Sequence, residues 1–548
     1  MSASSKKKLR KEQEAAKLTE KQLTAQKEAK KTKLYTAAFV AVMALILAVA
    51  VVVGVSQFIT NSGIREKNTT ALTIGEHKLS NADLNYFYVD SVQNFYSQNG
   101  SYANLFGLDT TLPLNEQVFD ETTGETWADY FLDYAKNTAA SVYTMVDAAN
   151  AAGHTLTEEE TANIDTMMST FELYASLYGY SDTESYIKAM YGKGATEKGI
   201  RNYLEMSVLA DSYNTAYIES LTYEDADLRA AEAENYDQYS SYNYNYYYLA
   251  ASRFLEGGTT DENGSTTYSD EETAASIAAA EEAAASIASA EITSVDELDA
   301  AIAALPVNAE STTAKSSAYE DYAYSSIDTD LTAWLSDDAR EAGDITYIAN
   351  TSTSTDEEGN EVTETLGYYV IYFHSENDNA FAMKNARHIL VSFEGGTTDD
   401  LGNTTYSDEE KATAKTAAEE ILNEWKAGEA TEDTFAALAV ERSDDTGSTA
   451  NGGLYEDIYP GQMVEAFENW CYDESRVAGD TGIVETTYGY HVMYFVGDSE
   501  TTYRDYLIES ELADADHAEW YNAIVDSAEV TEVDTKYLSK DIVLGGSY

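Results

Sequence analysis

A stretch of seventeen residues occurs twice in this chain, with the second copy 138 positions after the first. Residues 256–272 read EGGTTDENGSTTYSDEE, and residues 394–410 read EGGTTDDLGNTTYSDEE. Both copies continue into an alanine- and glutamate-rich stretch. Both regions end in a similar apolar run, GYYVIYF at 367–373 and GYHVMYF at 489–495. A chain built in this way is expected to contain two copies of one folding unit.

The repeats also set the expected domain boundaries. The two units are predicted at about residues 242–378 and 384–498, followed by a C-terminal segment at 499–548. Residues 60–240 show helical patterns, and the chain has only three prolines to interrupt its helices. The C-terminal segment contains a strand-like apolar run at 542–544. Helix starts are predicted at residues that can cap a helix: Ser80, Thr157 with Glu160, Ser181 and Thr196.

The N-terminal region combines a basic tail with a long apolar run. Residues 1–33 carry 11 Lys and Arg against 4 Glu, whereas the rest of the chain carries 22 basic and 93 acidic residues. Residues 34–58 contain more than 20 consecutive uncharged residues, enough to cross a bilayer about 30 Å thick. A single-pass anchor is predicted there, with the tail in the cytoplasm and the rest of the chain outside the cell membrane. A cleaved signal peptide is disfavoured because the basic tail is long.

Charge and cysteine content narrow the class of protein. The formal net charge is −64, which argues against nucleic-acid binding because phosphate contacts require a basic face. Cys471 is the only cysteine, so the chain cannot form an intrachain disulfide. An extracellular chain without disulfides fits the cell envelope of a Gram-positive bacterium better than a eukaryotic secretory route.

Two of the six histidines lie in short apolar runs, and several small motifs stand between them. His388 lies in ARHILV and His491 in TYGYHVM. Between them come SDDTGS at 443–448, GGL at 452–454 and GQMVEAF at 461–467. A histidine alone on a strand is most often a buried structural residue. A pair of histidines framing three ordered motifs indicates a site instead.

These five motifs, in this order, resemble the parvulin (PpiC-type) peptidyl-prolyl isomerases over about residues 385–497. The helical layout of residues 60–240 resembles the helical domain of SurA- and PrsA-type chaperones. The resemblance implies an α+β chain in which a helical chaperone-like domain precedes two parvulin-like domains, each a small antiparallel sheet with surrounding helices. It also implies that residues 499–548 pack back on the chaperone-like domain.

The resemblance assigns roles to residues of the second repeat. Residues matching the catalytic positions are His388, Asp445, Thr486, Tyr488 and His491. Residues matching the substrate pocket are Met463, Phe467, Tyr455 and Gln462. The two histidines are expected to hold each other in one tautomer rather than to shuttle protons. Met463 and Phe467, four residues apart, are expected on one helical face.

Two details of this assignment stay open in the sequence. The spacing of SDDTGS favours Asp445 over Asp444, although a slip of one residue is compatible with it. The family usually has GGDLG after this loop, whereas this chain has GGLYE at 452–456, which leaves the pocket wall undetermined. The resemblance implies no cofactor and no metal.

The first repeat lacks the chemistry of the second. The offset of 138 places Ala250 at the position of His388, and Tyr369 stands at the position of His491. One long alanine-rich helix is predicted at 274–303. The first repeat is therefore interpreted as an inactive structural or client-binding module.

The repeated acidic loop bears on specificity. Acidic residues after the first strand of the second repeat, at 399–400 and 408–410, argue against a preference for phosphorylated Ser/Thr-Pro sites. A calcium site is a weaker interpretation than a polar hairpin ahead of a helix, because the residues lack the order of a calcium-binding EF-hand loop.

The sequence thus predicts an extracytoplasmic peptidyl-prolyl cis/trans isomerase and chaperone that assists the folding of secreted proteins. Its expected partners are unfolded or newly secreted polypeptides with X-Pro bonds, and a homodimer is compatible with the sequence. The main alternative is a non-catalytic holdase that uses the parvulin fold as a scaffold. A surface adhesin with two degenerate domains is a third and weaker alternative.

Overall fold

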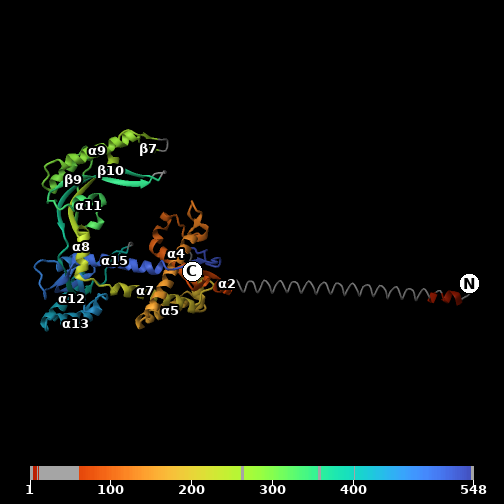
Figure 1. Cartoon of the computed structure of the whole chain (residues 1–548). Helices are drawn as coiled ribbons and strands as arrows, with labels where there is room; N and C mark the ends of the chain where they lie inside the picture. The colour runs from red at the N-terminus through yellow and green to blue at the C-terminus, as the bar shows by residue number, and fades with distance from the viewer. Residues whose placement is uncertain are drawn as a thin grey trace. The chain divides into compact units, whose positions relative to one another are not determined.

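The computed structural model describes residues 4–8, 10–11, 61–260, 264–355, 359–399 and 402–544. The predicted anchor at 34–58 and most of the predicted tail at 1–33 lie outside these residues. Among the helices of the described part, none is long and apolar enough to span a membrane. The chain divides into two compact units (Figure 1). The first is Met1–Leu221 with Asp516–Tyr548, and the second is Thr222–Ala515.

The first unit is mainly helical. Its helices are α2 (Ile64–Asn68), α3 (Asn81–Asn99), α4 (Trp127–Ala152), α5 (Glu158–Leu177), α6 (Thr183–Tyr191) and α7 (Glu197–Ser220). Ser80, Thr157 and Thr196 cap their helices as predicted. The prediction of Ser181 as a cap is wrong by one residue. The carboxylate of Asp182 accepts the hydrogen bond from the backbone N–H of Ser185 at 2.7 Å, and so caps α6 instead.

A three-stranded antiparallel sheet in the order β17-β1-β2 packs beside these helices. Its strands are β1 (Thr70–Ile74), β2 (His77–Ser80) and β17 (Val530–Glu532). The C-terminal segment therefore returns to the first unit. The predicted strand at 542–544 is wrong, because Ile542 accepts a hydrogen bond from the backbone of Leu114 and Leu544 is buried in the helical core. This apolar run fills the core rather than extending the sheet.

The connection between α3 and α4 is built from short elements. They are η1 (Gly100–Phe106), η2 (Leu114–Glu116), β3 (Val118–Asp120) and β4 (Glu125–Thr126). Leu108 and Leu114 of this connection are fully buried in the core of the unit, together with Phe131 of α4.

The second unit contains two four-stranded antiparallel sheets of the same strand order, β8-β5-β10-β9 and β14-β11-β16-β15. The first sheet consists of β5 (Ser241–Ala250), β8 (Ser317–Ala323), β9 (Ile345–Thr355) and β10 (Glu361–Asn377). The second consists of β11 (Ala382–Ser392), β14 (Leu454–Ile458), β15 (Thr481–Glu485) and β16 (Gly489–Thr502). Each sheet corresponds to one of the two sequence repeats, although β11 and β16 extend a few residues beyond the predicted bounds of 384–498.

Helices surround both sheets. Those of the first repeat are α9 (Asp270–Ala288), α10 (Val295–Ala303) and α11 (Thr329–Leu335), and α8 (Asp225–Glu234) precedes it. Those of the second are α12 (Asp408–Ala427), α13 (Glu432–Arg442) and α14 (Glu465–Cys471), and α15 (Tyr503–Val525) follows it. Figure 1 shows α9 running along the β9–β10 hairpin. The prediction of a single alanine-rich helix is wrong, because Ser294 caps a second helix by accepting from Glu297 N.

The repeated acidic stretches form a small hairpin ahead of a helix in both repeats. In the second repeat, the Glu410 carboxylate accepts hydrogen bonds from Gly396 N at 2.8 Å and from Ser407 N at 2.7 Å. In the first repeat, Glu272 accepts from Gly258 N at 2.9 Å in the same way. These carboxylates are therefore engaged in capping α12 and α9, as the hairpin interpretation expects.

The strand register corrects one alignment made from the sequence. His388 pairs with Met493, the fifth residue of GYHVM, and Tyr246 pairs with Ile371, the fifth residue of GYYVI. Tyr246, rather than Ala250, therefore lies at the level of His388. A 3-10 turn of four residues follows the first-repeat strand before the repeated acidic stretch, and this insertion shifts the offset from 138.

Candidate functional site

The two histidines of the second repeat meet on neighbouring central strands. His388 lies on β11 and His491 on β16, and both side chains are buried. They are diagonal neighbours rather than a direct pair, because His491 pairs with Leu390. Their rings stack with centroids 5.1 Å apart and an angle of 22° between the planes. The register of one strand pair thus brings together side chains 103 residues apart in sequence.

A chain of hydrogen bonds runs through both rings. His491 Nε2 lies 2.8 Å from Thr486 Oγ1, and the two Nδ1 atoms lie 2.9 Å apart. His388 Nε2 lies 2.8 Å from Asp445 Oδ2 and 3.1 Å from Ser448 Oγ. Four side chains that the sequence assigned to the site, together with Ser448, therefore form one connected network.

The Asp445 carboxylate determines which atoms donate and which accept along this series of hydrogen bonds. Ionised Asp445 can only accept, so His388 Nε2 carries the hydrogen, and its Nδ1 accepts. His491 then donates from Nδ1 and accepts at Nε2 from the Thr486 hydroxyl. Every ring nitrogen has at least one partner, and each neutral histidine is held in a single tautomer.

Burial and hydrogen bonding keep these groups in defined charge states. Burial, together with the neighbouring His388, lowers the pKa of His491 to about 4, and burial also lowers the pKa of His388. Burial alone would raise the pKa of Asp445. Hydrogen bonds from Ser448, His388 and the backbone of Gly447 outweigh it and bring that pKa down to about 2. At neutral pH the site therefore contains two neutral imidazoles and one carboxylate.

The loop that carries Asp445 is pinned to β11 by its neighbours. Ser443 Oγ accepts from Leu390 N at 3.1 Å, and the Asp444 carboxylate accepts from Ser392 N at 2.8 Å. These bonds direct Asp444 toward the strand backbone and leave Asp445 facing His388. The structure thus brings Asp445, and not Asp444, into the site.

A glycine makes room for this loop beside the strand. Gly453 has a φ of +71°, and a Cβ at this position would lie 2.1 Å from the carbonyl oxygen of His388. Its own carbonyl accepts a hydrogen bond from His388 N at 2.8 Å. The backbone comes this close only because the residue has no side chain. Directly after it, β14 begins and places Tyr455 beside Asp445, with the hydroxyl 3.1 Å from Oδ2.

A pocket of about 310 Å³ opens over the histidines. Its lining residues are His388, Leu390, Asp445, Tyr455, Gln462, Met463, Val464, Phe467, Tyr488 and His491. Phe467 stands edge-on to both imidazoles, with its ring centroid 5.5 Å from each. The pocket therefore has an apolar side, formed around Phe467 and Met463, that faces a polar side with a single carboxylate.

Comparison with known proteins agrees with this geometry. Residues 369–497 match the family model described as the PPIC-type PPIase domain. The second repeat is a parvulin-type domain. A curated relative, foldase protein PrsA 1 of Listeria innocua, is 41% identical over 92 residues, which make up 17% of this chain and 29% of that protein. The chain thus spans less than a third of the length of this relative.

Two solved structures show weaker similarity. The peptidylprolyl isomerase PrsA from Bacillus anthracis has 22% identity over 27% of this chain and 59% of that one, with a TM-score of 0.17. PrsA from Bacillus subtilis has 14% identity over 77% of this chain and 96% of that one, with a TM-score of 0.25.

Eight of the nine residues assigned from the sequence line the pocket of the parvulin domain. The ninth, Thr486, lies behind His491 and accepts from Tyr488 N at 3.2 Å. Tyr488 itself is 63% exposed and stands at the mouth. Met463 differs from its expected position, because α14 begins at Glu465 and Met463 precedes it. It reaches the same pocket from the loop.

The sequence assignment missed three residues of the parvulin domain. Leu390 and Val464 line the pocket, and Ser448 donates to Asp445 Oδ2 at 2.5 Å. Leu390 could have been found from strand alternation, since it is two residues after His388 and faces the same side of β11. Ser448 was visible as the last residue of SDDTGS, but a serine in a polar loop carries no signal of its own.

Proposed function

We propose that the parvulin domain of this chain is a peptidyl-prolyl cis/trans isomerase. The observation that carries the proposal is the pocket in which Met463 and Phe467 face the network of Asp445, His388 and His491. An apolar recess beside one partly buried carboxylate suits a proline ring and the amide that precedes it. The family match over residues 369–497 supports the same activity.

The chemistry requires conformational stabilisation rather than bond cleavage. Amide resonance imposes a barrier of about 18–20 kcal/mol, and uncatalysed X-Pro exchange takes tens to hundreds of seconds. Resonance places negative charge on the carbonyl oxygen and positive charge on the nitrogen. A catalyst that disfavours this charge separation favours the twisted state, in which resonance is lost.

Each residue of the pocket then has a proposed task. Met463 and Phe467 hold the proline ring, and Tyr455, Gln462 and Tyr488 border the bound peptide. Asp445, kept ionised by its hydrogen bonds, faces the carbonyl oxygen of the reacting amide and opposes the negative charge that resonance places there. His388, His491 and Thr486 keep Asp445 oriented and donate no proton to the substrate.

At the level of the whole chain, we propose an extracytoplasmic foldase for unfolded or newly secreted polypeptides. The basic residues at 1–33 and the apolar run at 34–58 support a single-pass anchor with its N-terminus in the cytoplasm. In this arrangement residues 60–240 serve as the chaperone-like domain and 384–498 as the isomerase. The names of the PrsA relatives support a foldase.

A non-catalytic holdase is the second candidate function. The observation that favours it is the first repeat, which keeps the strand order of a parvulin-type sheet with Tyr246 and Tyr369 at the histidine positions. A protein that uses one such sheet without the network could use both as scaffolds.

The experiment that separates these functions measures cis/trans exchange at an X-Pro bond in a short unphosphorylated peptide, with the full chain. Asp445→Asn keeps the shape of the side chain and removes its charge, so exchange should slow by about tenfold or more. Asp444→Asn is the matched control and should stay within about twofold, because Asp444 faces the strand backbone. No acceleration by the folded wild-type chain would exclude the isomerase and leave the holdase.

A further inference from the structure

The connection between α3 and α4 in the first unit exposes an unusual number of large apolar side chains. The exposed residues are Tyr102, Leu105, Phe106, Leu112, Val118 and Phe119, and we refer to them as the η1–β3 surface. Leu105 is 82% exposed and Phe106 is 54% exposed. Exposed apolar side chains scattered singly need no explanation, but several on one short connection mark an interaction site.

This connection is a built platform and not a loose loop. Ala103, Leu108 and Leu114 are buried and anchor it in the core of the unit. The buried amide of Gln117 accepts from Asp109 N at 2.8 Å and donates to the carbonyl oxygens of Asp109 and Leu112, each at 2.9 Å. The exposed side chains are therefore presented by an ordered backbone, which lowers the entropy lost when a partner binds.

The exposed rings are continuous with one another. Phe106 contacts Phe95 at 6.1 Å between centroids, and Phe95 contacts Trp127 at 5.6 Å. Trp127 in turn contacts Phe119 at 4.9 Å. The partly buried ring of Phe95 and the buried ring of Trp127 thus join the two exposed rings into a single aromatic strip.

Acidic residues alone accompany this strip in the sequence. Between Lys78 and Lys136 the chain has nine Asp and Glu and no Lys, Arg or His. Five of these acids lie on the connection itself: Asp109, Glu116, Asp120, Glu121 and Glu125. None of the five takes part in an ion pair within the described ranges, which leaves their charge available to a partner. Hydrogen bonds from Thr111 and Thr122 lower the pKa of Asp109 and Asp120, respectively, and keep them ionised.

We propose that the η1–β3 surface binds segments of unfolded polypeptide that are both apolar and basic. Apolar side chains of the segment would cover Leu105, Phe106 and Phe119, while its Lys or Arg residues would meet the surrounding carboxylates. The inference rests on the proposed function only in that both concern unfolded clients, since this surface needs no proline. It gives the protein a selectivity for client segments that the isomerase pocket does not supply.

The same charges argue against two other occupants. A second copy of the chain would bring an identical set of unpaired carboxylates against the first, which opposes an isologous contact. An anionic membrane surface would be repelled for the same reason. A basic, apolar polypeptide satisfies both the rings and the carboxylates.

The test uses the purified full chain and a fluorescent twelve-residue peptide of Phe, Leu and Lys without proline. Binding is compared with that of a peptide in which Glu replaces Lys. The Lys peptide should bind about tenfold more tightly at low salt. The double variant Leu105→Ser/Phe106→Ser should weaken its binding by about tenfold or more. The matched control, Leu173→Ser/Leu177→Ser, changes two exposed leucines of α5 and should stay within about twofold.

Charge variants and an activity control complete the design. Asp120→Asn/Glu121→Gln/Glu125→Gln should remove the preference for Lys over Glu. Asp445→Asn should slow X-Pro exchange and leave peptide binding unchanged. A wild-type chain that binds the Lys peptide but does not accelerate X-Pro exchange would overturn the proposed function and not this inference.

Three results from the peptide-binding and sedimentation measurements would overturn the inference, and a vesicle-binding measurement could give a fourth. These are equal losses in the α5 control, no preference for the Lys peptide, or self-association in sedimentation that only Leu105→Ser/Phe106→Ser abolishes. Binding of wild-type chain to phosphatidylglycerol vesicles that is lost in the same variant would also overturn it, in favour of a membrane contact.

Discussion

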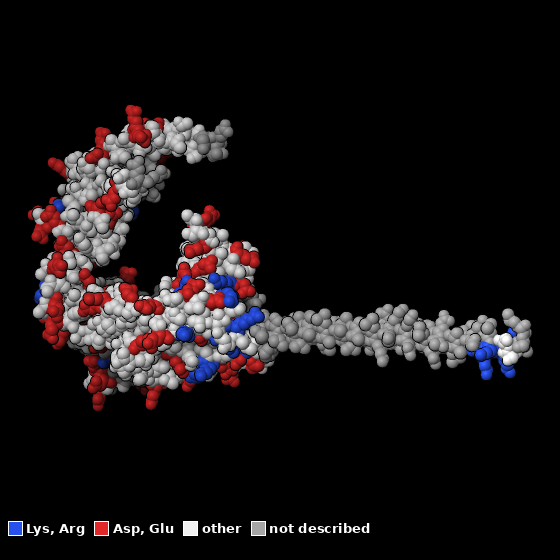
Figure 2. All heavy atoms as spheres, turned by 45° about the vertical axis from the view of Figure 1, so that its right-hand side comes forward, with Lys and Arg blue, Asp and Glu red and all other residues white. Residues whose placement is uncertain are grey.

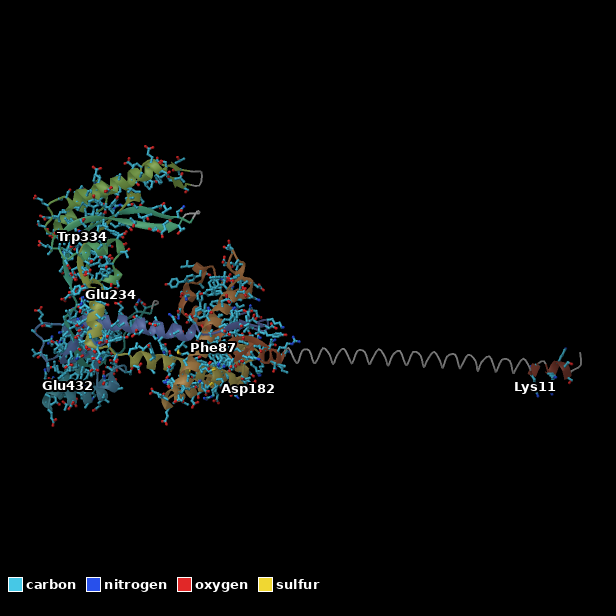
Figure 3. All side chains as sticks on the ribbon, viewed as in Figure 1. Lys11, Phe87, Asp182, Glu234, Trp334 and Glu432 are labelled. Atoms are coloured by element: carbon cyan, nitrogen blue, oxygen red, sulfur yellow. The ribbon has the colours of Figure 1, made fainter. Side chains whose placement is uncertain are left out.

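The two repeats of the second unit share a framework. Both have the same strand order, and both carry a tryptophan covered by an arginine. Figure 3 labels the tryptophan of the first repeat, Trp334. Arg340 lies 3.9 Å from the ring centroid of Trp334, and Arg476 lies 4.0 Å from that of Trp470. Each arginine also donates from Nε to the carbonyl of its tryptophan at 3.0 Å. The two repeats therefore share the strand order and the individual contacts between the arginine and the tryptophan.

The repeats differ at the centre of the sheet. Where the second repeat has its two histidines, the first has Tyr246 and Tyr369, with ring centroids 6.0 Å apart. Tyr319 stacks on Tyr246 at 5.1 Å and 10°. Stacked rings thus fill the space that the hydrogen-bonded chain occupies in the second repeat. The first repeat forms its sheet without the network, so a sheet of this strand order does not require it.

The largest expected effect comes from truncating the ring that forms the pocket. Leu331 stands as far before Trp334 as Phe467 stands before Trp470, and both residues are buried. Phe467→Ala should destabilise the second repeat by about 3–5 kcal/mol, and Leu331→Ala should destabilise the first repeat by about 2–5 kcal/mol. Only Phe467→Ala should slow X-Pro exchange. Native-state hydrogen exchange at the buried amides of Val492 and Val370 reports the two repeats separately. Equal loss of isomerisation in both variants would break the comparison.

The glycine beside His388 should come next. Gly453→Ala places a methyl group against the His388 carbonyl and forces an alanine into a left-handed conformation, at a cost of about 3 kcal/mol. Gly461 has φ +84° with open space around it, so Gly461→Ala should cost only about 1 kcal/mol. The unfolding free energies of the two variants are measured by denaturant titration with hydrogen exchange as the probe. Equal costs would show that the close approach at Gly453 is unimportant.

The pH dependence should differ between the repeats. The pKa of folded His491 is about 4, below its unfolded value. The unfolded state therefore takes up the proton first as the pH falls. Stability is complete above about pH 6.5, and from pH 7 to pH 5 the second repeat should lose about 2 kcal/mol. His491→Gln should flatten the curve. The first repeat contains only His374, whose pKa burial also lowers, and should depend less on pH. A curve unchanged by His491→Gln would contradict the neutral histidine pair.

The smallest effect should be equal in the two repeats. Arg476→Lys and Arg340→Lys each lose a stacked guanidinium and one hydrogen bond to a carbonyl, worth about 1–2 kcal/mol together. Isomerisation should be unchanged in both variants. Thermal unfolding with a probe in each repeat checks this, and a clear asymmetry would show that the framework is less alike than the contacts indicate.

Local signals predicted much of the fold. Capping residues marked the helices at Ser80, Thr157 and Thr196, and the repeated stretches marked two sheets with the same strand order. Long-range features were harder to predict. The pairing of β17 with β1 depends on contacts between the two ends of the chain, which no local pattern encodes.

The candidate site shows the same difference between what local motifs predict and what depends on long-range contacts. Ordered motifs named nine residues, and eight line one pocket. The sequence favoured Asp445 over Asp444 but left a slip of one residue open, because the choice depends on which carboxylate the backbone of Ser392 engages. The sequence also placed Ala250, and not Tyr246, at the level of His388. The offset of 138 aligns the two acidic hairpins, but the four-residue insertion after β5 shifts the strands that precede them. Figure 2 shows acidic side chains spread over the face of the molecule in view, so an acidic residue type alone does not distinguish the carboxylate of the site.

The most direct test of this account is the exchange rate of an X-Pro peptide with the full chain, measured for one pocket variant in each repeat. Met463→Ala changes the second repeat, and Tyr369→Ala changes the aromatic counterpart of its site in the first. The account predicts acceleration by the wild type and by Tyr369→Ala, with a loss of about tenfold or more in Met463→Ala. Acceleration that survives Met463→Ala, or that is lost in Tyr369→Ala, would contradict the assignment of the activity to the second repeat.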